Sequence, residues 1–338
     1  MCALPVGKLP ASLLRQLLAD LPVDDDVLVG PGIGRDAAAI RVGDQVLVLK
    51  TDPITFPTND AGWYLVNINA NDIACMGAEP RWLLVTALLP EAGATPDLVE
   101  ALFSSLRDGC QQTGCVLIGG HTEITEGLDR PILVGQMVGV TTQERLIDPT
   151  TARPGDAVLL IGGIAVEGTS ILATDASERL AREIDPDVLE SASNFARSPG
   201  ISVLRYARRL AEQVGVSIRA MHDPTEGGLA TGLLEIAEAT ELGISVDSAA
   251  VHVYEESAAI TEALDIDPWG LIASGALLAV VPAEHADRAV ESCREPGVPA
   301  ARIGTLTSDP AERTLIVDGK RESIPVFAVD EIARYFAS

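Results

Sequence analysis

The stretch Asn67-Ile-Asn-Ala-Asn-Asp-Ile-Ala-Cys-Met-Gly-Ala-Glu-Pro80 decides how this chain is understood. It places three asparagines and one aspartate within six positions of an otherwise apolar segment. Such side chains compete with the backbone for hydrogen bonds, and burying them is costly unless something binds them. Asn67 and Asn71 lie four positions apart and share one helix face, with Asp72 beside them. This face is expected to hold a hydrated cation or a polyanion; the alternative is a solvated face with an Asn-rich turn.

The length of the chain favours two domains. At 338 residues it exceeds one typical hydrophobic core, and 47% of its residues are hydrophobic, as in a globular protein. A change to Pro, Thr and Gly over residues 148–155 places the boundary, so we predict domains at 1–150 and 151–338. No apolar run reaches the roughly 20 residues of a membrane span, and no secretory signal is recognisable. A cytoplasmic location is expected.

The charge of the chain limits its partners. A formal net charge of −25, from 49 acids and 24 bases, argues against nucleic acids and anionic membranes as partners. A nucleotide remains compatible if metal ions bridge its phosphates to carboxylates. The four histidines show no metal-binding spacing, and the five scattered cysteines are expected to be reduced.

Hydrophobic periodicity predicts helices mixed with strands in both halves, an α+β or α/β architecture. Gly43-Asp44 is a hairpin signal between two of the strands. Helices are expected at 13–21, 60–76, 96–113, around 170, and at 187–196, 203–214, 229–239, 254–264 and 285–293. Strands are expected at 37–42, 45–51, 82–89, 115–120, 132–141, 157–161, 216–221, 244–246, 276–281, 301–306 and 314–317.

A glycine loop, Gly30-Pro-Gly-Ile-Gly-Arg-Asp36, superficially resembles a dinucleotide-binding fingerprint. It precedes a strand hairpin instead of a helix, so the Rossmann interpretation fails. Two interpretations stay open: a loop that presents the amides of Gly30, Gly32 and Gly34 to phosphate, or a plain turn.

Three carboxylates come from separate elements: Asp36, Asp52 at the end of an apolar strand, and Asp72. Together they suit Mg²⁺, which takes oxygen ligands and shares them between carboxylates, water and phosphates.

A second polar group follows a predicted strand at Gly119-Gly-His-Thr-Glu123. His121 is either a structural hydrogen-bonding residue or, with Glu123, an assistant in proton transfer.

The second half contains a related turn, Met221-His-Asp-Pro-Thr-Glu-Gly-Gly-Leu-Ala230, which opens a helix. Its glycines allow close approach of a ligand, and a helix N-terminus favours an anion. Asp223, Thr225 and Gly227 are therefore candidate ligand contacts. The alternative is a tight turn capped by Asp223 or Thr225.

Taken together, these segments resemble the superfamily of aminoimidazole ribonucleotide (AIR) synthase, thiamine-monophosphate kinase, selenophosphate synthetase and the hydrogenase-maturation protein HypE, with HypE-like proteins the most similar. The motifs follow that family's order along almost the whole chain. They are Gly-x-Asp-Ala-Ala at 34–38, Thr-Asp at 51–52, Asn-Asp-Ile-Ala-x-Met-Gly-Ala-x-Pro at 71–80, Gly-Gly-x-Thr at 119–122, Arg-Pro-Gly-Asp at 153–156 and Asp-Pro-Thr-x-Gly-Gly-Leu-Ala at 223–230.

The resemblance implies an N-terminal domain that pairs with its twin into a shared β-barrel, followed by a C-terminal α/β domain. It also implies an ATP- and Mg²⁺-dependent enzyme that phosphorylates an oxygen of a small molecule. The residues implied for metal binding are Asp36, Asp52 and Asp72, and those for ATP are the glycine loop, Gly119, Gly120 and Asp223. From the residues themselves we further expect Asn67 to contact the nucleotide and Asn71 to orient a phosphate or water beside Asp72. His121 or Glu123 is expected to assist proton transfer.

Three departures from HypE shape the expectation. HypE ends in a cysteine, whereas this chain ends Arg334-Tyr-Phe-Ala-Ser338, which argues against synthesis of the cyanide ligand. Arg35 replaces an acid and Glu226 replaces an arginine of the family pattern, so these two are expected to face each other across the cleft. Two alternatives remain: a non-catalytic nucleotide-binding dimer that acts as an assembly partner, and a small-molecule kinase of the thiamine-monophosphate type.

Overall fold

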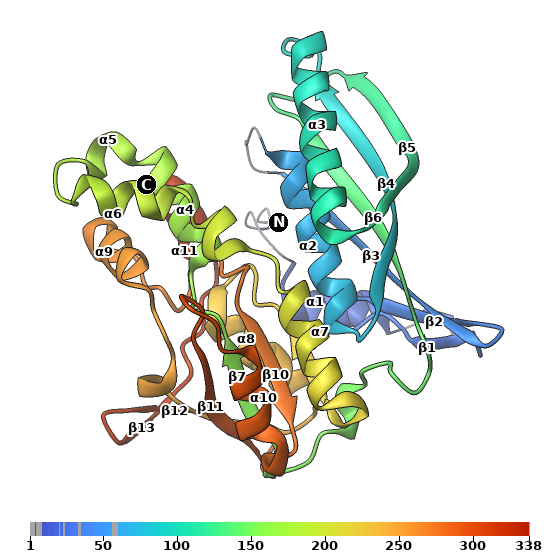
Figure 1. The fold of residues 1–338 in the computed structure, drawn as a ribbon, viewed down its shortest axis with the longest axis vertical. Helices are drawn as coiled ribbons and strands as arrows, with labels where there is room; N and C mark the ends of the chain where they lie inside the picture. Colours follow the sequence, from blue (N-terminus) through green and yellow to red (C-terminus); the bar gives the residue numbers. More distant parts are fainter. Residues whose placement is uncertain are drawn as a thin grey trace. The chain divides into compact units, whose positions relative to one another are not determined.

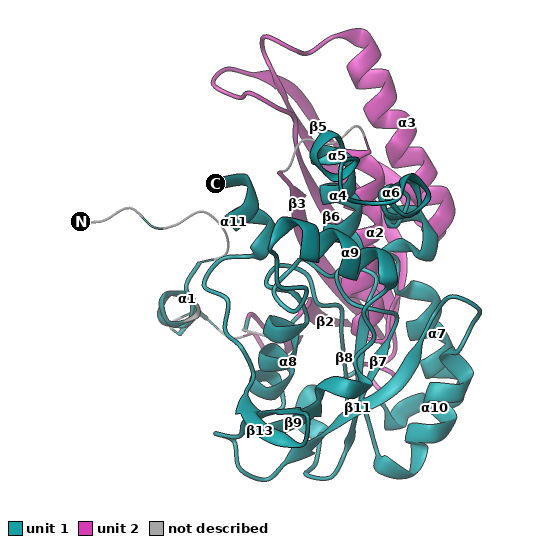
Figure 2. Cartoon of the chain, turned by 90° about the vertical axis from the view of Figure 1, so that its left-hand side faces the viewer, with its two compact units in different colours: residues 1–22, 32–35, 147–338 teal, residues 23–31, 36–146 magenta. Residues whose placement is uncertain are grey.

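The computed structural model describes residues 4, 9–19, 21–22, 24–32, 35–55 and 60–337 (Figure 1). The chain divides into two compact units (Figure 2). The N-terminal unit contains residues 23–31 and 36–146, and the C-terminal unit contains residues 1–22, 32–35 and 147–338. Both units combine helices with one sheet, so the chain has a two-domain α+β fold.

The sheet of the N-terminal unit has six strands in the order β1-β2-β3-β6-β4-β5. Neighbouring strands are antiparallel except β4 and β5, which are parallel. The predicted hairpin is confirmed: Val42 pairs with Gln45, and Gly43 adopts a φ of +61° that glycine tolerates. The strands are β1 (Val27–Val29), β2 (Ala38–Val42), β3 (Gln45–Ile54), β4 (Glu79–Pro90), β5 (Val116–Thr125) and β6 (Ile132–Thr141).

Helices α2 (Ala61–Cys75) and α3 (Pro96–Thr113) cover one face of this sheet (Figure 1). Helix α3 has the predicted bounds because its ends carry clear signals. The Thr95 side chain accepts a hydrogen bond from the Leu98 N–H, and Gly114 ends the helix with a φ of +81°. Helix α2 has no such caps and is instead buried along its whole length, including its asparagines. The alternative of a solvated face at 67–72 is therefore wrong.

Glycines allow α2 to lie close to its neighbours. A Cβ on Gly62 would lie 2.7 Å from the Leu106 backbone nitrogen of α3, and one on Gly109 would lie 2.8 Å from the Val66 Cβ. Against the sheet, a Cβ on Gly139 would lie 2.2 Å from a methyl carbon of Ile73. The close spacing of these helices and the sheet is thus possible because these three positions carry no side chain.

The sheet of the C-terminal unit has seven strands in the order β13-β12-β9-β11-β7-β10-β8. All neighbours are antiparallel except β12 and β9. The strands are β7 (Ala157–Ile161), β8 (Ala220–His222), β9 (Gly243–Asp247), β10 (Leu277–Val281), β11 (Ala300–Thr307), β12 (Arg313–Val317) and β13 (Lys320–Ser323). Strands β7 and β10 are buried at every residue, as expected for central strands covered on both faces.

Helix α8 packs on one face of this sheet in a core shared with Val158, Leu160 and Val280. Helices α7 and α10 lie on the other face (Figure 1), and α4, α9 and neighbouring segments form a second core around Leu172 and Ile260. The helices of the unit are α1 (Ala11–Leu18), α4 (Val166–Asp175), α5 (Ser177–Leu180), α6 (Pro186–Ser193), α7 (Leu204–Gln213), α8 (Gly228–Ala239), α9 (Glu255–Leu264), α10 (Ala286–Cys293) and α11 (Glu331–Ala337).

Several segments differ from the sequence expectation. The strand predicted at 216–221 is only β8, because residues 215–217 form a 3₁₀ turn that begins at Gly215 with a φ of +63°. Strand β5 continues through Gly119 and Gly120 to Thr125. The prediction that this glycine pair lies at the end of a strand is therefore wrong. Strand β13 and helix α11 were not predicted, since both are short.

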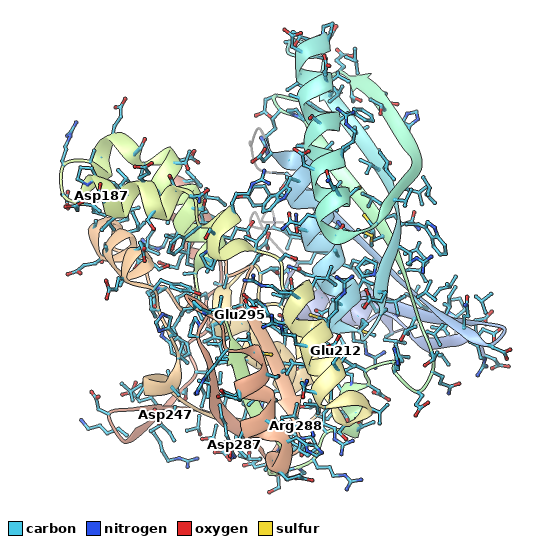
Figure 3. All side chains as sticks on the ribbon, in the orientation of Figure 1. Asp187, Glu212, Asp247, Asp287, Arg288 and Glu295 are labelled. Carbon is cyan, nitrogen blue, oxygen red and sulfur yellow. The ribbon has the colours of Figure 1, made fainter. Side chains whose placement is uncertain are left out.

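The acidic composition is visible on the C-terminal unit, where Asp187, Glu212, Asp247 and Asp287 are exposed (Figure 3). None of the helices within the described residues combines the length and apolar character needed to cross a bilayer.

We expect Gly62→Ala to lower the free energy of unfolding by about 1–3 kcal/mol, because the added methyl group overlaps the α3 backbone. Alanine would otherwise favour the helix, so a loss of stability isolates the steric effect. Chemical denaturation measures the change. Gly93→Ala is the matched control, since its nearest neighbour would be a Pro90 side-chain atom at 3.5 Å. Equal stability of both variants would contradict the proposed close contact.

Candidate active site

The strand register places two charged side chains of β3 beneath α2. Asp52 pairs with Gly135 of β6, and a Cβ on Gly135 would lie 2.7 Å from the Asn69 amide nitrogen of α2. Paired residues share a face, so the Asp52 side chain points to the α2 side of the sheet. Lys50, two residues earlier on the same strand, points the same way.

Lys50 joins two of the three predicted metal ligands. Its Nζ lies 3.4 Å from Asp52 Oδ2 and 3.3 Å from Asp72 Oδ1. The Asp72 side chain is only 8% exposed and that of Lys50 19% exposed, so the group is poorly solvated. The structure therefore brings Asp52 and Asp72 together, and the lysine compensates part of their charge. Lys50 was not among the predicted site residues, although its position two residues before Asp52 was a usable signal.

Asn69 and Asn67 use their amides differently. Each donates its Nδ2 hydrogen to the carbonyl four residues earlier, Leu65 O or Trp63 O, at 2.9 Å. The Asn69 oxygen also accepts a hydrogen bond from the Asp52 N–H at 3.2 Å, which ties α2 to β3. Asn67 Oδ1 is buried and has no hydrogen-bond partner within the described residues. Asn69 is thus structural, whereas Asn67 keeps a buried acceptor available for a ligand.

The remaining N-terminal candidates are less closely defined. Asn71 is fully buried in α2, and Asp36 is half-buried just before β2. Gly34 lies outside the described residues. Gly30 belongs to the N-terminal unit and Gly32 to the C-terminal unit, where a Cβ on Gly32 would lie 2.9 Å from the Arg35 side chain. Their roles in binding metal or phosphate stay predictions.

The glycine pair of β5 follows a β-bulge. The register between β4 and β5 shifts by one residue at Ile118, and a Cβ on Gly120 would lie 1.9 Å from the Val85 carbonyl oxygen. A side chain cannot be placed there, so the backbone conformation alone requires glycine at this position. Contacts of Gly119 and Gly120 with a nucleotide stay predictions.

His121 and Glu123 lie on the face of the sheet opposite α2. Val85 of β4 pairs with Gly135 and therefore lies on the α2 side of the sheet. Thr86, the next residue of β4, points to the opposite side and pairs with His121. His121 Nε2 is 2.8 Å from Glu123 Oε2, and both side chains are at least half exposed. Hydrogen bonds from His121 and Thr125 lower the pKa of Glu123. The two form a surface pair, and the assistance of either residue in proton transfer stays a prediction.

In the C-terminal unit, the turn before α8 is stabilised by a residue that is distant in the sequence. Gly227 is the N-cap residue with a φ of +81°, and no side chain caps the helix. The Gly227 N–H donates instead to Asp330 Oδ2 at 2.6 Å. Neither Asp223 nor Thr225 is therefore the N-cap residue of α8, and capping of the turn by their side chains stays a prediction. Ligand contacts of Asp223, Thr225 and Gly227, and the pairing of Arg35 with Glu226, stay predictions.

Comparison with known proteins places this geometry in a family. Residues 34–141 match the N-terminal domain of the AIR synthase related protein family, and residues 153–316 match its C-terminal domain. Carbamoyl dehydratase HypE of Cupriavidus necator is 32% identical over 312 residues, 90% of this chain and 84% of that protein. A protein of Methanocaldococcus jannaschii whose name connects it with hydrogenase expression and formation is 30% identical over 315 residues, 90% of this chain and 89% of that protein.

A solved structure agrees with these relatives. The crystal structure of hydrogenase maturation protein HypE in complex with ATP is 27% identical, with a TM-score of 0.71 over 94% of this chain and 90% of that chain. The chain belongs to the AIR synthase-related family. Within that family it is a HypE-like member, as its motifs predicted.

Asn69→Leu should lower the free energy of unfolding by about 1–3 kcal/mol, because the partly buried Asp52 N–H would lose its acceptor. Asn67→Leu also removes a hydrogen bond to the preceding helical turn. The oxygen that it removes, however, accepts no hydrogen bond within the described residues, so this variant should lose less stability. Denaturant titration of both variants measures the difference. An equal or larger loss at position 67 would contradict the two roles.

Lys50→Met should make the protein more dependent on divalent metal. Without the lysine, Asp52 and Asp72 repel each other, so thermal stability in EDTA should fall and Mg²⁺ should raise Tm more than in the wild type. Differential scanning calorimetry with and without Mg²⁺ measures both effects. Lys320→Met, at an exposed lysine of β13, is the control. An unchanged Mg²⁺ response in Lys50→Met would count against a metal at these carboxylates.

Proposed function

We propose that this protein is an ATP- and Mg²⁺-dependent enzyme that activates an oxygen of a small molecule by phosphoryl transfer. The observation that carries the proposal is the convergence of Asp52 and Asp72 on the α2 side of the sheet, beside a helix whose Asn67 retains a free acceptor. Relatives over most of the chain include carbamoyl dehydratases and a HypE with bound ATP, which supports the same chemistry.

We assign two roles to these residues: some would bind the metal ion, and others would orient the reacting groups. Asp36, Asp52 and Asp72 would hold Mg²⁺, which when bound neutralises charge on the phosphates during transfer. Asn71 and Asn67 would orient a phosphate or water through their amides. Catalysis would rest on positioning and electrostatics, without a covalent protein intermediate.

The acceptor that we propose is a diffusible molecule and not a cysteine of the described chain. The four cysteines of that part, Cys75, Cys110, Cys115 and Cys293, are all buried. Burial raises the pKa of Cys293 and so disfavours its nucleophilic thiolate. Hydrogen bonds from Cys110 and Thr113 lower the pKa of Cys115 to about 7, so for this residue the argument rests on its burial alone.

A second copy of the chain is the proposed protein partner. Strand β5 ends the sheet, and Val116 and Ile118 are 57% and 55% exposed there, with Trp82 of the neighbouring strand 37% exposed. A long exposed strand edge with apolar side chains is a site for pairing with another chain. A homodimer would cover it in the shared barrel that the family resemblance implies.

Asp72→Asn should reduce Mg²⁺-dependent ATP turnover by about 10²-fold or more, while the fold is retained, because the amide removes a charged oxygen ligand. Phosphate release and circular dichroism measure activity and fold. Asp44→Asn, at an exposed hairpin residue of the same unit, should leave turnover unchanged. Full activity of Asp72→Asn would refute the metal assignment.

Calorimetry with ATP and MgCl₂, followed by assays of phosphate release and product analysis, separates the alternatives. Turnover with loss of the phosphate from the product supports phosphorylation-driven dehydration. A stable phosphorylated product would instead indicate a kinase of the thiamine-monophosphate type. Nucleotide binding without turnover across candidate acceptors would indicate a non-catalytic assembly partner.

A further inference from the structure

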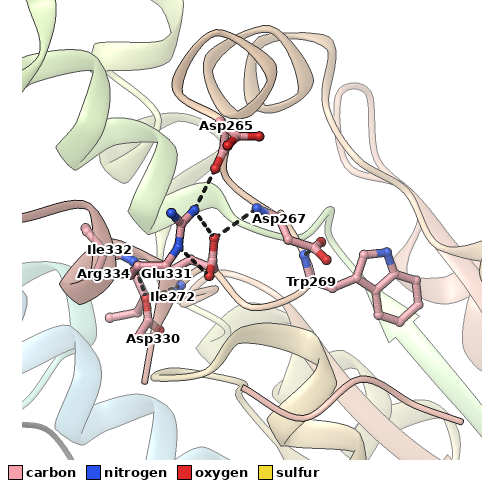
Figure 4. Close-up of polar contacts among 8 residues, drawn as sticks. All are labelled: Asp265, Asp267, Trp269, Ile272, Asp330, Glu331, Ile332 and Arg334. Atoms are coloured by element: carbon pink, nitrogen blue, oxygen red, sulfur yellow. Dashed lines mark hydrogen bonds and ion pairs between the residues drawn. The ribbon is translucent and has the colours of Figure 1, made fainter. Parts of the chain in front are cut away.

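Three segments of the C-terminal unit meet around the start of α8. Asp330, which precedes α11, accepts hydrogen bonds from the backbone N–H groups of Ile332 at 2.8 Å and Ile272 at 3.4 Å (Figure 4). It also accepts a hydrogen bond from the Gly227 N–H at 2.6 Å. The first turn of α4 joins the same place, because the Gly168 N–H donates to Ile272 O at 3.1 Å. The carboxylate of Asp330 is thereby fixed in position.

Two glycines allow these segments to approach each other. A Cβ on Gly168 would lie 2.4 Å from the Leu271 Cγ, and one on Gly228 would lie 2.5 Å from the Trp269 carbonyl oxygen. Gly228 also has a φ of +64°, which disfavours other residues. The α4 start, the α8 start and residues 269–272 are therefore in direct contact.

Glu167 is buried at this junction, where no described residue makes a hydrogen bond of ordinary geometry to its carboxylate. The residue is 0% exposed, and neither carboxylate oxygen has a hydrogen-bond partner in the described part of the chain. Ser274 lies close enough to lower the pKa of Glu167, but no hydrogen bond of ordinary geometry joins them, and the buried Ser274 hydroxyl is likewise unsatisfied. A buried carboxylate normally has several hydrogen bonds or an ion pair, so this arrangement is costly by itself.

Other carboxylates increase that cost. Burial is the main reason that the pKa of Glu167 is raised to about 7, and the charges of Asp330, Asp223 and Glu226 raise it further. Burial also raises the pKa of Asp330 to about 6, although backbone N–H groups oppose the shift. Four acids thus lie within electrostatic range of Glu167 or Asp330; Glu226 is exposed and the other three are buried.

We propose that Glu167 and Ser274, surrounded by the carboxylates of Asp223, Glu226 and Asp330, bind a divalent metal ion in the C-terminal unit. The ion would take oxygen ligands from both unsatisfied side chains and offset the repulsion among the acids. This site is separate from Asp52 and Asp72, which belong to the N-terminal unit, and it does not rest on the proposed phosphoryl transfer.

A divalent ion fits these residues better than an organic ammonium group. The side chains available are carboxylates and a hydroxyl, which are the ligands of hard metal ions. Glu167 and Ser274 are both 0% exposed, so only a compact ion can satisfy them. A single positive charge would also leave most of the four acids uncompensated.

The test uses the full-length protein with Asp52→Asn and Asp72→Asn, which removes the predicted N-terminal metal site. After treatment with EDTA, Mg²⁺, Mn²⁺ and Ca²⁺ are titrated separately at pH 8 without nucleotide. We expect at least one of these ions to bind in calorimetry and to raise Tm. Adding Glu167→Gln should weaken that binding by about tenfold or more and remove the Tm increase, without lowering Tm in EDTA.

Glu212→Gln, at an exposed acid of the same unit, is the matched control and should keep the metal response. The proposal is overturned if none of the three ions binds, or if the response survives Glu167→Gln. It is also overturned if Glu167→Gln lowers Tm in EDTA as much as the metal raises it, since Glu167 would then be a structural residue. Stabilisation by ethylammonium but by none of the metals would indicate an amine site instead.

Discussion

Complete burial of α2 is the constraint on which the N-terminal unit depends. All fifteen residues of a helix that contains three asparagines and an aspartate are buried between the sheet and α3. Leaving such a polar group without a partner is costly, so contacts inside the protein are favoured. Asn69 finds a partner in the Asp52 backbone and Asp72 in Lys50, so the same contacts that hold the helix on the sheet also bring the acidic side chains together.

The C-terminal unit treats its acids differently. Asp330 is held by three backbone N–H groups, whereas Glu167, one helix away, has none. Satisfying one buried acid so fully while leaving its neighbour unsatisfied is not an arrangement that stability alone would favour. The imbalance indicates that the acids of the C-terminal unit have a role beyond stability.

Much of the architecture was predictable where local signals are strong. Helix α3 has the expected bounds because Thr95, Pro96 and Gly114 determine its ends, and the strand at 132–141 was also found in full. The order of the motifs along the chain was sufficient to indicate the family without structural information. The strand expected at 216–221 was mostly wrong because Gly215 directs the chain into a turn that apolar content does not reveal.

The site was predictable only in part. Asp52 and Asp72 were found because each stands out within an apolar segment, and the structure brings them together. Lys50 was missed as a site residue although it lies two residues before Asp52, because its contact with Asp72 depends on how α2 packs on the sheet. The burial of Glu167 beside Asp330 depends on contacts between segments far apart in the sequence. No local pattern records that Asp330 holds the Gly227 turn.

The position of Asp330 has a practical consequence for anyone who shortens this protein. Removing the last ten residues would delete only one small helix, yet it would release the backbone of the turn that starts α8. Arg334 would be lost as well, together with its bonds to Glu331 and the Asp265 carbonyl (Figure 4). A purification tag is therefore better added after the final residue than put in place of the last ten residues.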